Sequence, residues 1–300
     1  THIEWVKAYR ERFVVLAVLR IAGVLAVHGI VPDFYAVVDP YPMMLNAGRE
    51  GLAHSEKVPL LASYHANLAV VANWQSNIYF DGSRLPWTSE LNLPSLLTAG
   101  PTVTHFALSI AVMGSPRAIY LLGMDLCYGG QGLQSHCSHS SETKAGPSLG
   151  QVGIQQVRTY AGELADADVH LLISADTAAS LAAYAREKDI SIFNLSDTAQ
   201  VVEGIDYISP HKIDVDSLRG SPQPEIDSDA TAEVLVEVGE YLSKLKAEFE
   251  GILDDLKQLR DVIEQRSKDI PRLFNARGLI RPQVSRQVAG IDDLVRRPVR

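Results

Sequence analysis

The 300-residue sequence predicts an α/β fold with a doubly wound, mostly parallel, Rossmann-like sheet and a C-terminal helical region. Two observations predict this. Short apolar segments alternate with helix-like segments along the first two thirds of the chain, and apolar residues follow a heptad repeat near its end. A hydrophobic content of 46% and a charged content of 21% are typical of a globular chain. We therefore expect one large α/β domain with a helical appendage.

Seven short apolar segments are the predicted strands, at residues 13–18, 34–38, 58–62, 78–80, 118–122, 169–173 and 190–193. Most are continuously apolar, as in strands that helices cover on both faces. Apolar residues spaced three and four apart predict a helix over 102–114, and a shorter stripe predicts another from Ala178. Residues 3–12 also have a helical pattern, so we expect the first strand of the sheet to precede Thr1.

Three regions follow from these patterns: an α/β domain over residues 1–208, a proline-rich linker over 209–230 and a helical region over 231–300. The helical region contains a heptad seam ended by Pro271, formed by Leu235, Val238, Leu242, Leu245, Phe249, Ile252, Leu256, Leu259 and Ile263. Such a seam must be buried. We expect it to form a homo-oligomer through 235–263, or to pack on a partner protein, rather than to fold back on its own chain.

Charge and cysteine usage exclude several classes of protein. A net charge of −9 argues against nucleic-acid binding through bulk charge. No apolar run approaches the ~20 residues that span a bilayer. With only Cys127 and Cys137 there is no disulfide framework, and a reducing cytoplasm is the expected location.

Candidate ligand-binding residues lie where predicted strands end and a helix begins. Asp39 and Asp125 each end a strand, where carboxylates can orient ribose hydroxyls or bind a metal ion. Gly100 and Thr102 precede a predicted helix, whose free N–H groups would suit a phosphate. In each case an ordinary capping role is the alternative.

A long irregular stretch, residues 128–150, follows the strand that ends at Asp125 and is a candidate mobile lid. It contains His136 and His139, either of which can act as a general base near neutral pH, and Tyr128, which can donate to a leaving phosphate. A zinc site and an inert surface loop are the alternatives. Ser148 is expected to cap a helix that begins near Gln151.

Several stretches together resemble the MptE-like central domain of the motility accessory factor (Maf) flagellin glycosyltransferases: VHGIVPDFYAVVDP, VPLLASYHAN, LLTAGPTVTHFALSIAVMGSPRAIYLLGMDLCY and IFNLSDTAQVVEGI. The resemblance covers roughly residues 1–208 in consistent order. The segment from Gly100 to Tyr128 is the most specific, and its G-x-D pattern also resembles the family 42 sialyltransferases. The resemblance therefore implies a sialyltransferase-like fold.

The resemblance implies transfer of a nonulosonic acid, of the pseudaminic or legionaminic type, from its CMP donor to a serine or threonine of flagellin. Such a reaction inverts the anomeric centre and needs no metal or other cofactor. His136 or His139 would be the base, and Tyr128 would assist the departing phosphate. The implied nucleotide- and substrate-binding residues are Asp39, Asn67, Gly100, Thr102, Asp125 and Asn194.

The family's G-x-G-P-S phosphate loop would precede Thr1 and is not in this sequence. We therefore expect this chain to bind the nucleotide weakly. Two alternatives remain: a pterin pyrophosphokinase that uses ATP and Mg²⁺, with Asp39 and Asp125 as metal ligands, and a non-catalytic flagellin-binding factor.

Overall fold

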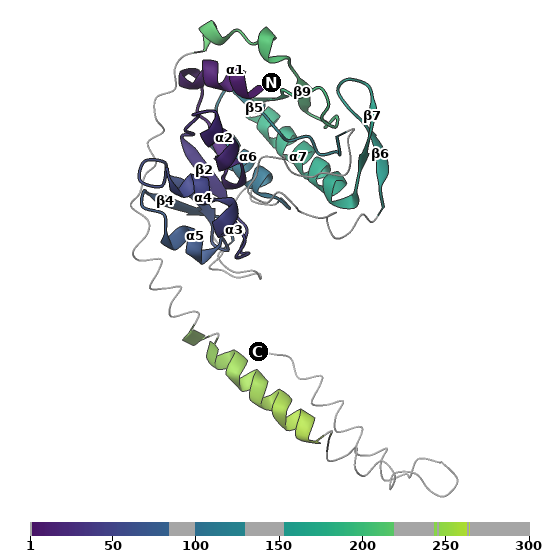
Figure 1. Cartoon of the computed structure of the whole chain (residues 1–300). Coiled ribbons are helices and arrows are strands. Elements are labelled where there is room, and N and C mark those ends of the chain that lie inside the picture. Colours follow the sequence, from purple (N-terminus) through teal and green to yellow (C-terminus); the bar gives the residue numbers. More distant parts are fainter. Residues whose placement is uncertain are drawn as a thin grey trace, which may run out of the picture. The chain divides into compact units, whose positions relative to one another are not determined.

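A computed structural model describes residues 2–83, 100–129, 153–218 and 243–264, the last range without 245 and 263. The chain divides into two compact units, Thr1–Glu225 and Ile226–Arg300 (Figure 1). Several predictions fall outside the described residues: those for His136, His139, Ser148 and most of the predicted lid, and those for Leu235, Val238, Leu242, Leu245 and Ile263 of the heptad seam.

The first unit contains two parallel sheets. One has the order β1-β2-β3-β4, with β1 at Leu16–Val18, β2 at Phe34–Val37, β3 at Leu60–Ser63 and β4 at Ile78–Asp81. The other has the order β5-β8-β9, with β5 at Ala118–Leu121, β8 at Ser191–Asn194 and β9 at Ile205–Tyr207. A separate antiparallel hairpin pairs β6, Gln155–Arg158, with β7, Leu164–Ala167.

Helices lie between the strands of the first unit. The α-helices are α1 His2–Ala8, α2 Ala22–Val27, α3 Met44–Ala47, α4 Arg49–Leu52, α5 Leu68–Ala72, α6 Val103–Met113 and α7 Val169–Glu187. The 3-10 helices are η1 Arg10–Arg12, η2 Leu19–Ile21, η3 Pro210–Lys212 and η4 Val215–Ser217. Their placement between parallel strands is that of a doubly wound fold.

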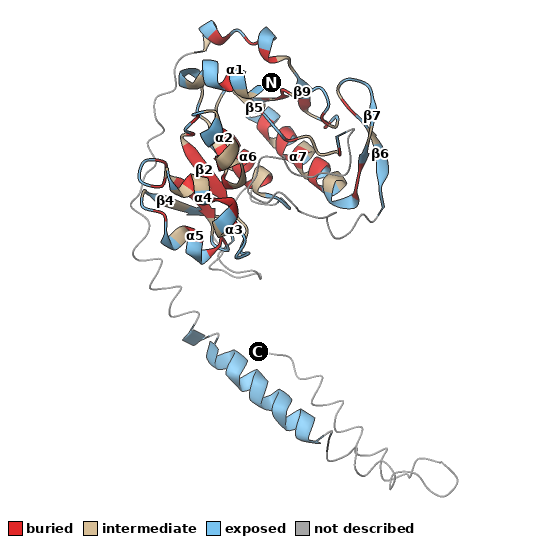
Figure 2. Cartoon of the chain, viewed as in Figure 1, coloured by how far each residue is buried: buried red, intermediate tan, exposed pale blue. Residues whose placement is uncertain are grey.

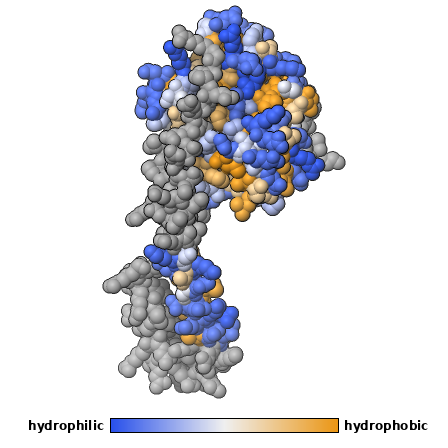
Figure 3. Space-filling view, turned by 90° about the vertical axis from the view of Figure 1, so that its left-hand side faces the viewer, coloured by the Kyte–Doolittle hydropathy of each residue, from blue (hydrophilic) through white to orange (hydrophobic). Residues whose placement is uncertain are grey.

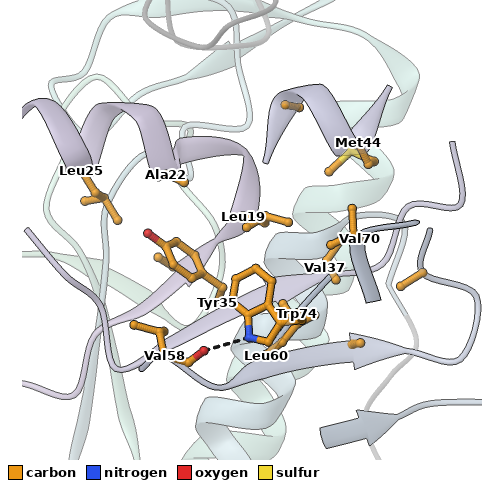
Figure 4. Close-up of a cluster of buried hydrophobic side chains, with 14 of the residues drawn as sticks. Leu19, Ala22, Leu25, Tyr35, Val37, Met44, Val58, Leu60, Val70 and Trp74 are labelled. Carbon is orange, nitrogen blue, oxygen red and sulfur yellow. Dashed lines mark hydrogen bonds between the residues drawn. The ribbon is translucent and has the colours of Figure 1, made fainter. Parts of the chain in front are cut away.

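Both faces of the four-stranded sheet are covered, which explains why β2 is buried at every position. On one face Tyr35, Val37 and Leu60 pack with Trp74 and residues of η2 to α5, and Trp74 Nε1 donates to Val58 O at 2.9 Å (Figure 4). The other face meets Phe106 of α6. Continuous apolar strands are therefore required here.

Helices α6 and α7 form the second core with the three-stranded sheet. Leu108 and Val112 of α6 pack with Leu121 of β5 and with the alanine-rich face of α7, which is buried (Figure 2). Helix α6 contacts β1, β2 and α7, so it links the two sheets.

The predicted α/β class is confirmed, but two local predictions are wrong. Residues 169–173, predicted as a strand, open α7, because Asp168 accepts a bond from Leu171 N and caps the helix. The helix expected to begin near Gln151 does not continue into the described residues that follow, because β6, which begins at Gln155, pairs with β7 in a hairpin there. Gly162, with φ of +85°, supplies the left-handed conformation in its turn.

The first unit also extends past residue 208. Ile213 and Val215, which lie in the expected linker, are buried in a cluster with Leu195. The compact unit therefore includes η3 and η4 and runs to Glu225.

The described part of the second unit is one helical stretch, within residues 243–264. Every described residue of this stretch is exposed (Figure 2). The exposed residues include the apolar residues of the heptad seam that lie in this stretch.

Candidate functional site

An asparagine holds the loop that follows β2. Asn67 N donates to Asp39 O at 2.9 Å, and Asn67 Nδ2 donates to Pro40 O at 3.1 Å. The same side chain caps α5, where its Oδ1 accepts from Ala69 N and Val70 N. Asn67 therefore positions the Asp39 loop, with three hydrogen bonds made by its side chain.

A second asparagine does the same at the other sheet. Asn194, at the end of β8, donates from Nδ2 to Met124 O at 2.9 Å and accepts at Oδ1 from Ser196 N at 3.0 Å. It is 3% exposed. It ties the loop after β5 to the loop after β8, and thereby brings Asp125 and Ser196 together. Asn67 and Asn194 were both predicted to bind substrate or nucleotide. Each instead holds the loop that carries a predicted aspartate, Asp39 for Asn67 and Asp125 for Asn194.

Asp125 is the most unusual polar group at this edge. Its Oδ1 is buried and has no hydrogen-bond partner within the part of the chain that is described. Burial raises the pKa of this carboxyl, while a bond from Ser196 and the nearby His2 oppose the shift. A buried acceptor without a donor costs about 1–3 kcal/mol, so the site is suited to a ligand that supplies a donor.

Gln200 adds a second acceptor nearby. Its backbone N donates to Asp125 O at 2.8 Å, and its Oε1 is buried without a partner among the described residues. Cys127 donates to Thr198 O at 3.4 Å. Burial, and then the charge of Asp125, raise the pKa of the Cys127 thiol. We call Asp125, Ser196 and Gln200 the strand-end site.

The start of α6 is organised around a fully buried histidine. His105 Nε2 lies 2.8 Å from Ser174 O in α7, and His105 Nδ1 lies 2.7 Å from Thr102 Oγ1. A carbonyl can only accept, so Nε2 carries the proton and Nδ1 accepts from Thr102. The Thr102 hydroxyl makes no capping bond. Since His105 N donates to Thr102 O at 3.1 Å, the N–H groups of Val103 and Thr104 are the ones suited to an anion.

Burial lowers the pKa of His105, partly opposed by its bond to Ser174 O. The folded-state pKa is then below the unfolded value of 6.5, so the unfolded chain binds more protons as the pH falls past 6.5. The stabilisation by neutral His105 is complete above pH 6.5 and is lost on acidification. We expect His105→Gln, which can keep both bonds, to flatten the decline in unfolding free energy between pH 7 and 5. A decline equal to that of the wild type in urea titrations would contradict this.

Gly100 is required by packing. A Cβ at this position would lie 2.3 Å from His105 Cβ, which is far too close. The missing side chain therefore leaves room for the buried His105. The sequence pattern had instead suggested that the glycine lets a ligand approach the backbone.

The predicted catalytic residue Tyr128 is also engaged. Its hydroxyl donates to Asp168 Oδ2 at 2.6 Å, and its backbone N donates to Asp166 O at 2.8 Å. Tyr128 and Asp168 are 5% and 4% exposed. Burial opposes ionisation of Asp168, but the bonds from Tyr128 and from the α7 backbone outweigh it and lower the pKa of this carboxyl. The phenol thus links the chain after β5 to the first turn of α7.

The structure brings the predicted residues together in two groups. Asp39 and Asn67 lie at the end of the four-stranded sheet, whereas Asp125 and Asn194 lie at the end of the three-stranded sheet. Sequence reasoning missed five residues: His105, Ser196, Gln200, Asp168 and Asp81. Asp81 ends β4, and one of its carboxylate oxygens is buried without a hydrogen-bond partner in the described part of the chain. Among these residues, only His105 had a local signal, since it lies three residues after Thr102 at the start of a predicted helix.

Two features of the described residues bear on function. In those residues there is no group of three or more His, Cys, Asp or Glu side chains placed to bind a metal ion. No described helix is both long and apolar enough to cross a membrane.

Comparison with known proteins agrees with this architecture. Residues 1–131 match the family described as 6-hydroxymethylpterin diphosphokinase MptE-like. The structure resembles that of the Maf glycosyltransferase from Magnetospirillum magneticum AMB-1, with a TM-score of 0.55 and 20% sequence identity. That similarity covers 79% of this chain and 34% of the other, so the chain spans about a third of that protein's length. No curated protein matches the sequence significantly.

The fold and the strand-end loops define a doubly wound, Rossmann-like α/β protein. Within this class, residues 1–131 are similar to the MptE-like family, and the chain has a fold similar to that of a Maf glycosyltransferase. The resemblance expected from the sequence is confirmed.

Proposed function

We propose that this protein is a Maf-type glycosyltransferase that moves a nonulosonic acid from a CMP-sugar to serine or threonine of flagellin. The supporting observation is the strand-end site, where a buried oxygen of Asp125 lacks a donor at the carboxyl end of β5. Ligands of open α/β sheets bind at this edge. Ribose hydroxyls or an amino group of the nucleotide would supply the missing donor.

In this reaction the acceptor hydroxyl oxygen attacks the anomeric carbon while the bond to the CMP phosphate oxygen breaks. His136 or His139 takes the hydroxyl proton, and the anomeric centre inverts. The N–H groups that open α6 are suited to hold the phosphate, since Thr102 does not cap them. Tyr128, through Asp168, would position the loop after β5. Transfer would take place in the cytoplasm, before flagellum assembly and motility.

A second candidate is transfer of diphosphate from ATP to a hydroxymethylpterin. The description of the family that residues 1–131 match favours it. Asp39 and Asp125 would then hold Mg²⁺. A third possibility, a flagellin-binding factor without catalysis, requires no nucleotide at all.

Calorimetric titration separates these candidates. We expect CMP to bind the wild-type protein weakly, and Asp125→Asn to weaken binding further by about 10- to 150-fold, since a lost charged hydrogen bond costs about 1.5–3 kcal/mol. Asp176→Asn, an exposed change on α7, is the matched control and should bind like the wild type. A flagellin mass increase in the presence of CMP-pseudaminic or CMP-legionaminic acid would demonstrate the transfer.

Other results would overturn the proposal. Binding of ATP with Mg²⁺ and no binding of CMP would favour the pyrophosphokinase. Flagellin binding without affinity for either nucleotide would favour the non-catalytic factor.

A further inference from the structure

The described helix of the second unit exposes an apolar seam. Phe249, Ile252, Leu256 and Leu259 follow each other at spacings of three, four and three, and are 39–57% exposed. Apolar groups are visible among charged ones on this helix (Figure 3). A continuous apolar stripe of this kind is typical of a surface that binds another protein.

The opposite side of the same helix is charged and internally paired. Lys257 Nζ lies 2.8 Å from Asp254 Oδ1, and Lys246 Nζ lies 3.9 Å from Glu250 Oε1. In the heptad that puts Phe249 at position a, Glu250, Asp254 and Lys257 all occupy outer positions. The helix therefore has one solvated face and one face without a partner among the described residues.

The charges beside the seam identify what fits it. With Phe249 at position a, the e positions carry Lys246, Leu253 and Arg260, and the g positions carry Glu248, Asp255 and Val262. The charged residues along one edge of the seam are thus basic and those along the other edge are acidic. In a parallel pair each g residue faces the e residue of the next heptad, whereas in an antiparallel pair g faces g and e faces e.

This pattern distinguishes the two orientations. In a parallel pair, Asp255 faces Arg260 of the second copy, twice by symmetry. In an antiparallel pair, acidic Glu248 and Asp255 face each other, as do basic Lys246 and Arg260. Like charges placed opposite each other are destabilising, so the seam is complementary to itself only when the helices run parallel.

We propose that the helix containing residues 246–262 binds the same helix of a second copy as a parallel, in-register coiled coil. The inference does not depend on the proposed enzymatic activity. In such a pair both chains enter the coiled coil from the same end.

Charge exchange tests the orientation with the full-length chain. Asp255→Arg places arginine opposite Arg260 of the second copy, and Arg260→Asp places aspartate opposite Asp255. We expect each single variant to weaken dimerisation roughly tenfold in sedimentation equilibrium, because two attractive pairs become repulsive. The double variant exchanges the two charges and should restore wild-type affinity.

Antiparallel packing predicts the opposite effect of Asp255→Arg on dimer affinity. The new arginine would then face Glu248 of the second copy and tighten the dimer. A tighter dimer with Asp255→Arg therefore overturns the proposal. So does a wild-type chain that remains monomeric at all concentrations, as expected for a seam that folds back or binds only a different protein. Far-UV circular dichroism of each variant checks that the helix is retained.

Disulfide trapping provides a second measurement. With Cys127 and Cys137 replaced by serine, Leu259→Cys at a d position should form a disulfide with its equivalent under mild oxidation, as only parallel helices place equal d residues together. Asp254→Cys, on the outer face, is the control and should not. Absence of the Leu259→Cys disulfide in a dimeric protein contradicts the in-register arrangement.

Discussion

Gly100→Ala is expected to lower the free energy of unfolding by about 2–3 kcal/mol, a large effect for one methyl group. The added Cβ would lie 2.3 Å from His105 Cβ and 2.8 Å from His105 Cγ. Neither atom is the free end of a flexible side chain, and His105 is held by bonds to Thr102 and Ser174. The segment before α6 must therefore move, and the N–H groups at the start of the helix must move with it.

Gly129→Ala is the matched control, because nothing lies within 4 Å of the added Cβ. Urea unfolding should show little change for this variant. If Gly100→Ala were equally stable but failed to bind CMP, Gly100 would serve ligand approach, and the packing explanation would be wrong.

Tyr128→Phe is expected to lower the free energy of unfolding by about 1.5–3 kcal/mol, because it removes a buried hydrogen bond to a carboxylate. The bond also helps to lower the pKa of Asp168 below 3.8. The stabilisation of the fold by this bond is therefore present above pH 3.8 and is lost as the pH falls further. The stability difference between wild type and variant should accordingly shrink in acid. Thermal unfolding at several pH values measures it.

Tyr160→Phe is a suitable comparison for this prediction. The Tyr160 hydroxyl donates to Ile205 O at 2.6 Å and accepts from Val202 N at 3.3 Å. Both partners are neutral, so the stability lost with this hydroxyl should depend less on pH than the loss in Tyr128→Phe. A Tyr128→Phe protein with unchanged stability and greatly reduced turnover would instead support a direct role for Tyr128 at the leaving phosphate.

Much of the fold could be predicted because local sequence determines it. The segment at 34–38 is continuously apolar, and β2 is buried at every position. The segment at 169–173 is also largely apolar but helical, and the capping residue Asp168 marks the start of the helix. Short apolar runs are ambiguous between strand and helix, so this error has a general cause.

The candidate site could be predicted only in part. Asp125 and Asn194 lie in stretches with a recognisable pattern, but their roles depend on partners far away in sequence. Asn194 contacts Met124 across 70 residues, and Tyr128 contacts Asp168 across 40. Such pairs leave no local signal, so the sequence suggested that the Tyr128 hydroxyl was free when it is in fact bonded.

We propose that a nucleotide binds at the strand-end site and the start of α6. Backbone NMR of the deuterated protein during CMP titration tests this proposal most directly. We expect the largest amide shifts at Asp125, Ser196, Gln200 and the first residues of α6. Shifts confined to another surface, such as the groove between α7 and Gly204, would contradict it.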